Sequence, residues 1–372
     1  MKWFGRKSAR DAARPALSRS GGMAPIGDWP RSYEAQVREA YLGNPVAQRA
    51  VKLVSEGVGG APLAASDPAL AALVAARSGG QGLLETVAAQ LLLHGNAYVQ
   101  ILMRDDGAVA ELFALRPERV AVEPDASGWP AAYRYKVGEH GLRLAAEEAG
   151  GRPGVVHIKA FHPLDDHLGL GCLGAAAPAV AVHNAAAKWN KALLDNAARP
   201  SGALVYDPGD GAVMSPEQFA RLKAEMEAGF AGAVNAGRPM LLEGGLKWQA
   251  MSLTPADMDF VGLKAAAARE IALAFGVPPM LLGLPGDAAY ANYREANRAL
   301  WRQAILPLAD KILGAIAQGL SGWFPEARLA VDLDRVTALS EDRERLWRQV
   351  SGAEFLTPEE KRAMLGVENR GK

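Results

Sequence analysis

The sequence has a single cysteine, Cys172, among its 372 residues. One cysteine cannot form an intrachain disulfide or build a zinc site that needs several thiolates, so both are excluded. This cysteine usage fits a reducing compartment. No run of about 18 uncharged apolar residues occurs either, so the sequence predicts no transmembrane helix and no membrane partner.

The sequence also lacks an excess of either charge, because 41 basic residues balance 41 acidic ones. Proteins that hold nucleic acid tightly usually carry a basic excess, so any DNA contact is expected to be local, weak or transient. Residues 1–27 are locally basic and lack the apolar middle of a secretory signal. This predicts a flexible basic arm, either solvated or touching a partner or DNA. Its basic residues are Lys2, Arg6, Lys7, Arg10, Arg14 and Arg19.

The motifs of common catalytic sites are missing: there is no G-x-S-x-G elbow, no Walker A loop and no H-E-x-x-H. The segment from Gly169 to Gly174 does match G-x-G-x-x-G, and Asp195 follows where a ribose-binding acid would be expected. That acid should end a second parallel strand, whereas Asp195 falls at the end of an unbroken helical pattern. We interpret the glycines as a tight turn into a helix, and we predict no catalytic residue and no cofactor.

One segment resembles a metal site, because imidazole and carboxylate groups together suit zinc, iron or manganese. Its residues are His157, His162, Asp165, Asp166 and His167. Their spacing does not place them on one helical face, and no second cluster occurs, so we predict no bound metal. Two alternative functions stay open: a metal-dependent hydrolase that uses His157, His162 and His167, and a structural scaffold without DNA contact.

Apolar residues make up 49% of the chain, which is enough for a core, and the order of segments predicts an α+β fold. Asp106-Gly107 between two apolar runs predicts a β-hairpin of strands 97–103 and 109–115. The other elements expected in the first half are helices at 31–59, 67–77 and 81–94, and strands near 119–123, 131–137 and 154–161.

Two long helices, at 175–197 and from Thr254 to Phe275, are expected to flank a small insert. Four polar residues of the first helix share one face because four, three and four positions separate them. They are Asn184, Lys188, Lys191 and Asp195. The insert is expected to contain a strand at 202–206, a helix at 215–230, and strands at 239–243 and 246–251. This order predicts a helical hairpin that carries a small domain at its tip.

The last part of the chain begins with a loop at 283–292 that is rich in glycine and alanine. A long helix is expected from Tyr293 to Leu320, with a kink at Pro307 because proline cannot donate the helical hydrogen bond. A strand at 327–333 and two short helices, at 340–352 and 357–365, complete the chain.

Several segments occur in an order that resembles the portal protein family of HK97-type tailed phages, above all the short portals of gene transfer agents and related prophages. The most specific is FGVPPMLLG, from Phe275 to Gly283, followed by Tyr290-Ala291-Asn292-Tyr293. Weaker similarities occur at Leu93–Tyr98, Leu115–Val120, Val156–Lys159, Arg199–Gly202 and Arg269–Ala272. Together these segments extend over residues 35–325.

The resemblance implies a portal fold with an α/β wing, a two-helix stem, a small α/β clip, a long kinked helix after a tunnel loop, and a short helical crown. The implied division is a flexible basic arm at 1–27, the wing at 28–173, stem helices at 174–198 and 253–276, the clip at 199–252, the tunnel loop at 277–292, the long helix and second wing part at 293–335, and the crown at 336–372. The crown is unusually short for the family.

The resemblance further implies a protein that is not an enzyme. It implies a dodecameric ring at the portal vertex of a virion or phage-like particle, assembled in the bacterial host cytoplasm. Double-stranded DNA would pass the ring sequence-independently during packaging and exit, and the ring would serve as a head-tail docking platform. The implied partners are further copies of the chain, the major capsid protein, the terminase packaging motor and a head-tail adaptor protein.

Three sets of candidate residues follow from this resemblance. The tunnel loop and DNA channel set is Gly286, Asp287, Tyr290, Asn292, Tyr293 and Arg294. The polar face of the stem is Asn184, Lys188, Lys191 and Asp195. The residues expected to pack between stem helices of neighbouring subunits are Ala265, Ala266, Ala267 and Ala268.

Overall fold

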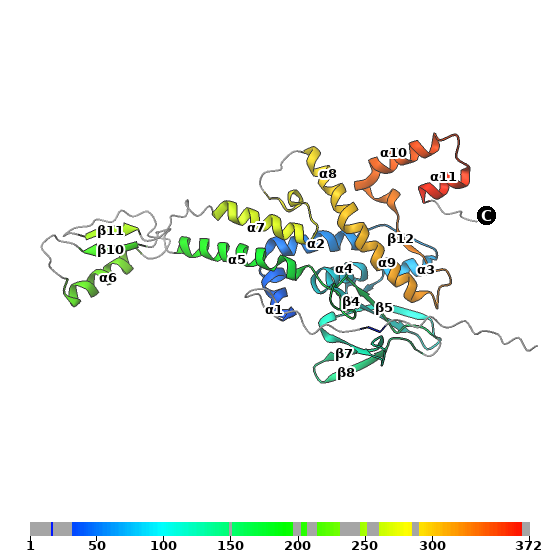
Figure 1. The fold of residues 1–372 in the computed structure, drawn as a ribbon, viewed down its shortest axis with the longest axis horizontal. Coiled ribbons are helices and arrows are strands. Elements are labelled where there is room, and N and C mark those ends of the chain that lie inside the picture. The colour runs from blue at the N-terminus through cyan, green and yellow to red at the C-terminus, as the bar shows by residue number, and fades with distance from the viewer. Residues whose placement is uncertain are drawn as a thin grey trace, which may run out of the picture.

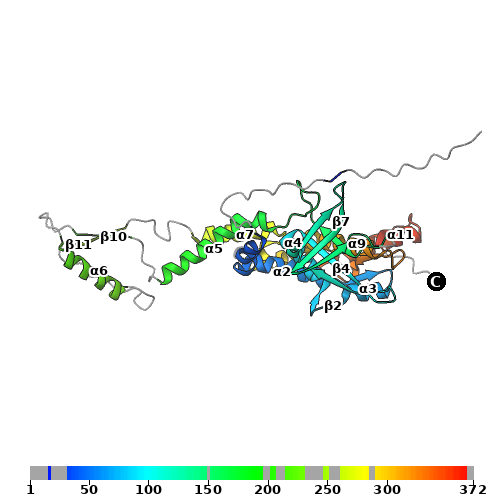
Figure 2. The same ribbon diagram turned by 90° about the horizontal axis from the view of Figure 1, so that it is seen from below.

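The computed structural model describes residues 16–17, 32–148, 151–195, 202–206, 214–230, 246–250, 260–284 and 290–366. Figure 1 shows a compact body of helices and sheets from which two helices, α5 (Leu173–Asp195) and α7 (Phe260–Ala274), extend side by side. A small unit of β10 (Gly202–Tyr206), α6 (Pro216–Phe230) and β11 (Leu246–Ala250) lies at their far end. Figure 2 shows the same separation from below.

The helix predicted at 31–59 is interrupted. It consists of α1 (Tyr33–Val37), a π-helical turn, η1 (Arg38–Leu42), and α2 (Pro45–Gly59). The side chain of Asn44 accepts hydrogen bonds from the backbone N–H groups of Val46 and Ala47 and so caps a new helix. The prediction of one helix was wrong here because the apolar pattern continues through this Asn-Pro break.

The helices and strands of the first half otherwise follow the predicted order. The helices are α3 (Pro68–Ala75) and α4 (Leu83–His94). One antiparallel sheet has the order β5-β4-β9, from Val109–Leu115, Asn96–Met103 and Val155–Lys159. A second has the order β6-β7-β8, from Val120–Pro124, Pro130–Val137 and His140–Ala145. Strand β8 was not predicted from the sequence, because it exposes four of its six residues and therefore lacks the apolar alternation of a half-buried strand.

Two short ladders complete the sheets of the body. β1 (Leu63–Ala65) pairs antiparallel with β12 (Leu329–Val331), so a strand near the beginning of the body lies beside one near the end of the chain. β2 (Arg77–Ser78) pairs with β3 (Gln81–Gly82) across a two-residue turn. In the distal unit, β10 and β11 lie where the sequence predicted strands, and they pair antiparallel with each other. The strand predicted at 239–243 lies outside the described residues.

The predicted long helix after residue 290 is also irregular. It comprises α8 (Tyr290–Leu300), a π-helical turn, η5 (Trp301–Ile305), and α9 (Leu306–Leu320). Pro307 lies at the start of α9, and its ring cannot fit against the carbonyl four residues earlier in an undisturbed α-helix. The π turn η5 ends two residues before Pro307, the position at which the sequence predicts a kink.

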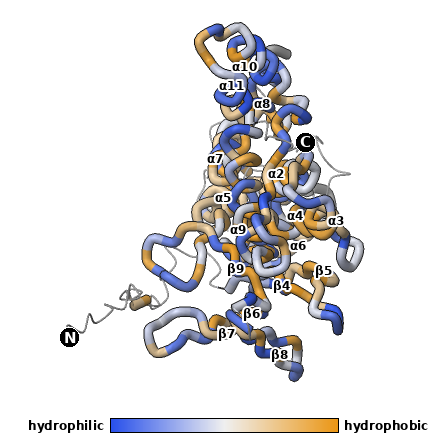
Figure 3. The backbone as a smooth tube through the Cα atoms, turned by 90° about the vertical axis from the view of Figure 1, so that its right-hand side faces the viewer, coloured by the Kyte–Doolittle hydropathy of each residue, from blue (hydrophilic) through white to orange (hydrophobic). Residues whose placement is uncertain are grey.

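The main core lies where α2, α4 and α9 meet the β5-β4-β9 sheet and the base of α5 and α7. Figure 3 shows apolar segments gathered around α9, β9 and β4, while α10 (Ser340–Ser351) and α11 (Pro358–Leu365) are largely hydrophilic. Burying a large aliphatic side chain contributes roughly 1.5–3 kcal/mol, so this region dominates the stability of the body. The large core side chains include Leu70, Ile271, Ile305, Ile312, Leu313, Ile316 and Leu320.

Candidate functional site

The G-x-G-x-x-G segment is a site of close backbone crossing. Gly169 and Gly171 lie against the end of α4 at Gly95, where a Cβ on Gly171 would come 2.5 Å from the carbonyl oxygen of Leu93. A Cβ on Gly169 would come 2.7 Å from the nitrogen of Ala160. No side chain fits at such distances, so the glycines are explained by packing, in agreement with the prediction of a glycine turn before α5.

Asn96 lies at the centre of this crossing and is buried. Its side-chain oxygen accepts from the N–H of Gly169 at 2.7 Å and pairs with Nε2 of His157 at 3.1 Å. Its amide nitrogen donates to the carbonyl of Gly169 at 3.1 Å and pairs with Nδ1 of His94, also at 3.1 Å. One buried amide thus joins α4, β4, β9 and the loop before α5, so it positions the base of the long helix.

The three histidines of the alternative hydrolase hypothesis have separate structural roles. His157 stacks on Tyr98 with ring centroids 4.3 Å apart, and the nitrogen of His167 contacts the carbonyl of Gly128. His162 accepts a hydrogen bond from the backbone N–H of Leu164. Within the described residues, no group of three or more His, Cys, Asp or Glu side chains could hold a metal ion. The metal-dependent hydrolase alternative therefore has no support.

Acid is expected to destabilise the protein through His157. Burial, with smaller contributions from Lys159, His94 and His167, lowers the pKa of His157 from 6.5 to about 3. Below pH 6.5 the unfolded chain binds a proton at this residue that the folded protein does not bind until about pH 3. The free energy of unfolding therefore falls as the pH is lowered from 6.5 towards 3, by up to about 3 kcal/mol near pH 4.5. Above pH 6.5 this residue does not change the stability.

Urea unfolding at several pH values measures this loss. A His157→Phe variant, which keeps an aromatic ring beside Tyr98 but cannot titrate, should show a shallower decline between pH 6.5 and 4.5 than the wild type. The matched control is His140→Gln at an exposed position of β8, which should keep the wild-type slope. Equal slopes for the His157→Phe variant and the wild type would contradict the assignment.

The polar face predicted on α5 is divided in the structure. The side chain of Asn184 accepts from Asn44 at 2.9 Å and donates to the carbonyl of Glu39 in the π turn η1 at 3.0 Å. The side chain of Asn184 therefore makes contacts within the subunit. Lys188 and Lys191 lie further along the helix and are exposed, and the side chain of Asp195 lies outside the described residues.

The four alanines of α7 are also divided. Ala267 and Ala268 are 4% and 2% exposed, so they pack against the subunit's own helices. This corrects the expectation that both contact a neighbouring subunit. Ala265 is half-buried, whereas Ala266 is exposed and has Leu263 on the same face. At the other end of the helix pair, Trp189 of α5 stacks on Phe260 of α7 with ring centroids 4.1 Å apart.

The predicted tunnel-loop residues lie at and before the start of α8. Gly286 and Asp287 are outside the described residues, and the side chain of Tyr290 is not described. Asn292 and Tyr293 are exposed on the first turns of α8.

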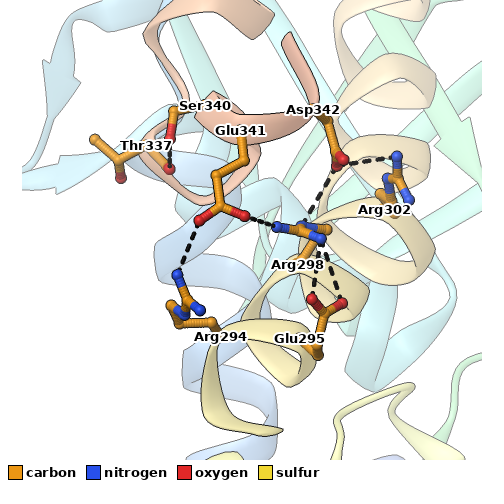
Figure 4. Close-up of polar contacts among 8 residues, drawn as sticks. All are labelled: Arg294, Glu295, Arg298, Arg302, Thr337, Ser340, Glu341 and Asp342. Carbon is orange, nitrogen blue, oxygen red and sulfur yellow. Dashed lines mark hydrogen bonds and ion pairs between the residues drawn. The ribbon is translucent and has the colours of Figure 1, made fainter. Parts of the chain in front are cut away.

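Arg294, expected near the channel, forms an ion pair of 2.8 Å with Glu341 of α10. Figure 4 shows that this pair belongs to a larger cluster of α8 and α10 side chains. Sequence reasoning missed the two acids of α10 because they lie more than 40 positions after Arg294 in the chain.

Within the described residues, no helix has the length and apolar character needed to span a membrane. The geometry defines an elongated α+β subunit in which a helix pair joins a compact body to a small distal unit.

Comparison with known proteins shows which family has this architecture. The family described as Phage portal protein matches residues 45–366. The chain is 40% identical to an uncharacterized protein of Rickettsia felis over 346 residues, which are 88% of each chain. It is 49% identical to a chain in the neck of a native gene transfer agent particle with C12 symmetry, with a TM-score of 0.70 over 94% of this chain and 97% of the other.

A portal protein of Enterobacteria phage HK97 is 25% identical over 199 residues, which are 54% of this chain and 44% of that protein. The chain belongs to the phage portal protein family, as the family match over most of its length establishes. Its role is at the portal vertex of a phage-like particle. The family is a structural one, and the resemblance found in the sequence is confirmed.

Proposed function

We propose that the chain forms a twelve-membered ring through which double-stranded DNA passes, without sequence readout, into and out of a phage-like capsid. The observation that carries the proposal is the 49% identity, over nearly all of both chains, to a subunit in a particle neck of C12 symmetry. The chain acts as a structural channel in this proposal and catalyses no reaction.

The faces of α5 and α7 that point away from the subunit support ring formation. α7 exposes Leu263, Ala266 and Leu273 in one stripe, of which Leu273 is 78% exposed. α5 exposes a face of small residues: Gly174, Pro178, Ala181 and Ala185. Leucine side chains of one subunit would fit over the small residues of the next, because small residues let two helices approach closely. The contact would bury apolar surface that is exposed in the single chain.

The charge of the chain supports a channel that lets DNA pass rather than one that binds DNA tightly. The chain has no net charge, and each phosphate contact of a protein adds affinity and salt dependence. A channel that gripped its cargo through many such contacts would slow it. Lys188 and Lys191 are exposed on α5 and are the residues that we expect nearest to the DNA on the stem. The segment around Gly286 would form the constriction.

The distal unit supplies the surface for further partners. β10, α6 and β11 stand at the end of the helix pair, clear of the body, and α6 exposes Phe219. We expect this clip to contact the head-tail adaptor protein and, during packaging, the terminase motor. The body, as the wing, would contact the major capsid protein.

Substitutions on α7 test the ring. Ala266→Trp should abolish rings while leaving the melting temperature of the subunit unchanged, because Ala266 is exposed in the single chain. Ala267→Trp should instead lower the melting temperature, since overpacking a buried site costs about 1–3 kcal/mol. Ala72→Trp, on the exposed face of α3, is the control for adding a large aromatic residue.

Negative-stain microscopy after expression with the other particle proteins is the measurement, since isolated portal subunits can fail to assemble alone. The wild type and the Ala72→Trp variant should give rings with a central opening. Assemblies without an opening would refute the proposed function, and normal rings from the Ala266→Trp variant would refute the α7 interface.

A further inference from the structure

Three arginines form a stripe on one side of the helix that follows the predicted tunnel loop. Arg294, Arg298 and Arg302 recur every fourth position, so successive guanidinium groups start about 6 Å apart along the helix axis. Arg302 lies in the π turn η5. The stripe is therefore about 12 Å long and begins one turn after Tyr290.

The first turn of α10 covers this stripe with acids (Figure 4). Glu341 lies 2.8 Å from Arg294 and 2.7 Å from Arg298. Asp342 lies 3.4 Å from Arg298 and 3.0 Å from Arg302. Each acid thus bridges two neighbouring arginines. The side chains of Arg298 and Asp342 are only 15% and 19% exposed, so the centre of the cluster is largely withdrawn from water.

The two C-terminal helices that carry these acids have little apolar attachment to the body. Of the residues in α10 and α11, Val350 and Leu365 are buried but do not belong to the main apolar core, while Trp347 and Met364 are 40% and 55% exposed. Beyond the N-cap residue of α10, Leu339, which is buried in the main core, the further anchors are polar: Asp334 accepts from Arg343 at 2.6 Å and from the indole of Trp347 at 3.0 Å. A unit attached mostly by ion pairs is one that competing ions can release.

We infer that Arg294, Arg298 and Arg302 form a phosphate-binding stripe for DNA that the first turn of α10 keeps covered in the single chain. The inference rests on the proposed passage of DNA. A guanidinium group binds carboxylate and phosphate oxygens with the same planar pair of donors, so Glu341 and Asp342 occupy the positions that phosphates would take.

DNA has the charge density to compete for these positions. A duplex carries one charge about every 1.7 Å of its axis, so a 12 Å stripe faces several phosphates at once. Two carboxylates of α10 supply the covering charge, and Glu295 of α8 itself also pairs with the central Arg298 at 3.0 Å. Displacement of α10 would expose three cations beside the DNA path, and return of α10 would remove them. The stripe would then hold DNA only while the C-terminal helices are displaced.

Neutralising the cover tests the inference on the purified full chain. A Glu341→Gln, Asp342→Asn double variant should bind a fluorescent duplex about tenfold tighter than the wild type near 50 mM NaCl, measured by fluorescence anisotropy. The slope of log affinity against log salt should steepen by up to about 2.7, because each phosphate neutralised contributes about 0.9. Adding Arg298→Gln to the double variant should cancel most of the gain.

The matched control is Glu344→Gln with Glu354→Gln, which removes two exposed acids from the same end of the chain outside the cluster. Equal affinities of the control and the double variant would overturn the inference, as would a gain that survives Arg298→Gln. If the double variant does not fold, the Glu341→Gln single variant is measured in its place. It should bind the duplex more tightly than the wild type, by a smaller factor than the double variant. An unchanged affinity for the duplex would refute the phosphate-binding stripe. If rings and DNA-filled particles form normally but the double variant shows no gain in affinity for the duplex, the phosphate-binding stripe is refuted and the proposed channel function stands.

Discussion

Replacing Gly95 with alanine is expected to cost about 3–5 kcal/mol, among the largest effects of a single substitution. Gly95 ends α4 with a φ of +82°, which residues with a Cβ adopt only at a cost. A Cβ there would lie 2.5 Å from the nitrogen of Gly171, and this contact is with backbone that cannot rotate away. Because domains are stable by only about 5–15 kcal/mol, much of the folding equilibrium would be lost.

Gly107→Ala separates the two causes of this loss. Gly107 has a similar φ of +78°, but no atom lies within 4 Å of its would-be Cβ. It should therefore cost only about 1 kcal/mol, the conformational part of the effect. Urea unfolding of both variants gives the comparison. Similar losses at the two positions would mean that the crossing of Gly95 and Gly171 is not tightly packed.

Deletion of residues 286–291 is expected to leave rings intact and to yield particles that are largely empty of DNA. The segment ends with the first two residues of α8, and glycine and alanine dominate it, so a close and smooth approach to the DNA is possible. Its removal takes nothing from the exposed faces of α5 and α7, on which ring formation depends in our proposal.

Nuclease-protected DNA per purified particle measures the effect, and electron microscopy of the same particles confirms the rings. Deletion of residues 367–372 removes the same number of residues from another part of the chain and should leave the DNA content at the wild-type level. Normal filling of the 286–291 deletion would remove the assignment of this segment to the constriction.

The sequence predicted those elements whose signals are local. The β4-β5 hairpin has Asp-Gly between two apolar runs, and α6 begins where Ser215 accepts from the N–H of Gln218 ahead of Pro216. The break at Asn44 was missed because the apolar period runs on through it. The four consecutive alanines from Ala265 have identical side chains, so the sequence does not indicate which of them are buried. The structure shows that Ala267 is buried and Ala266 is exposed.

The contacts that organise the candidate site are non-local, which is why sequence patterns could not predict them. Asn96 was visible only as part of a family-like segment, yet its amide joins groups from Gly169 and His157, far along the chain. Arg298 has one local partner, Glu295, but its partners on α10 follow more than 40 positions later, on a helix whose placement depends on the whole body. The sequence indicated the type of these residues but not their neighbours.

The pairing of β1 with β12 bears on how the subunit is made. Leu63 lies opposite Val331, and the N–H of Asp332 donates to the carbonyl of Pro62 at 2.8 Å. A chain emerging from the ribosome cannot close this ladder until nearly all of it has been synthesised, and such late, long-range contacts slow folding. Until residues 329–331 have been synthesised, the apolar core of the body therefore stays incomplete. Truncation by a stop codon before residue 331 should for this reason yield no folded subunit.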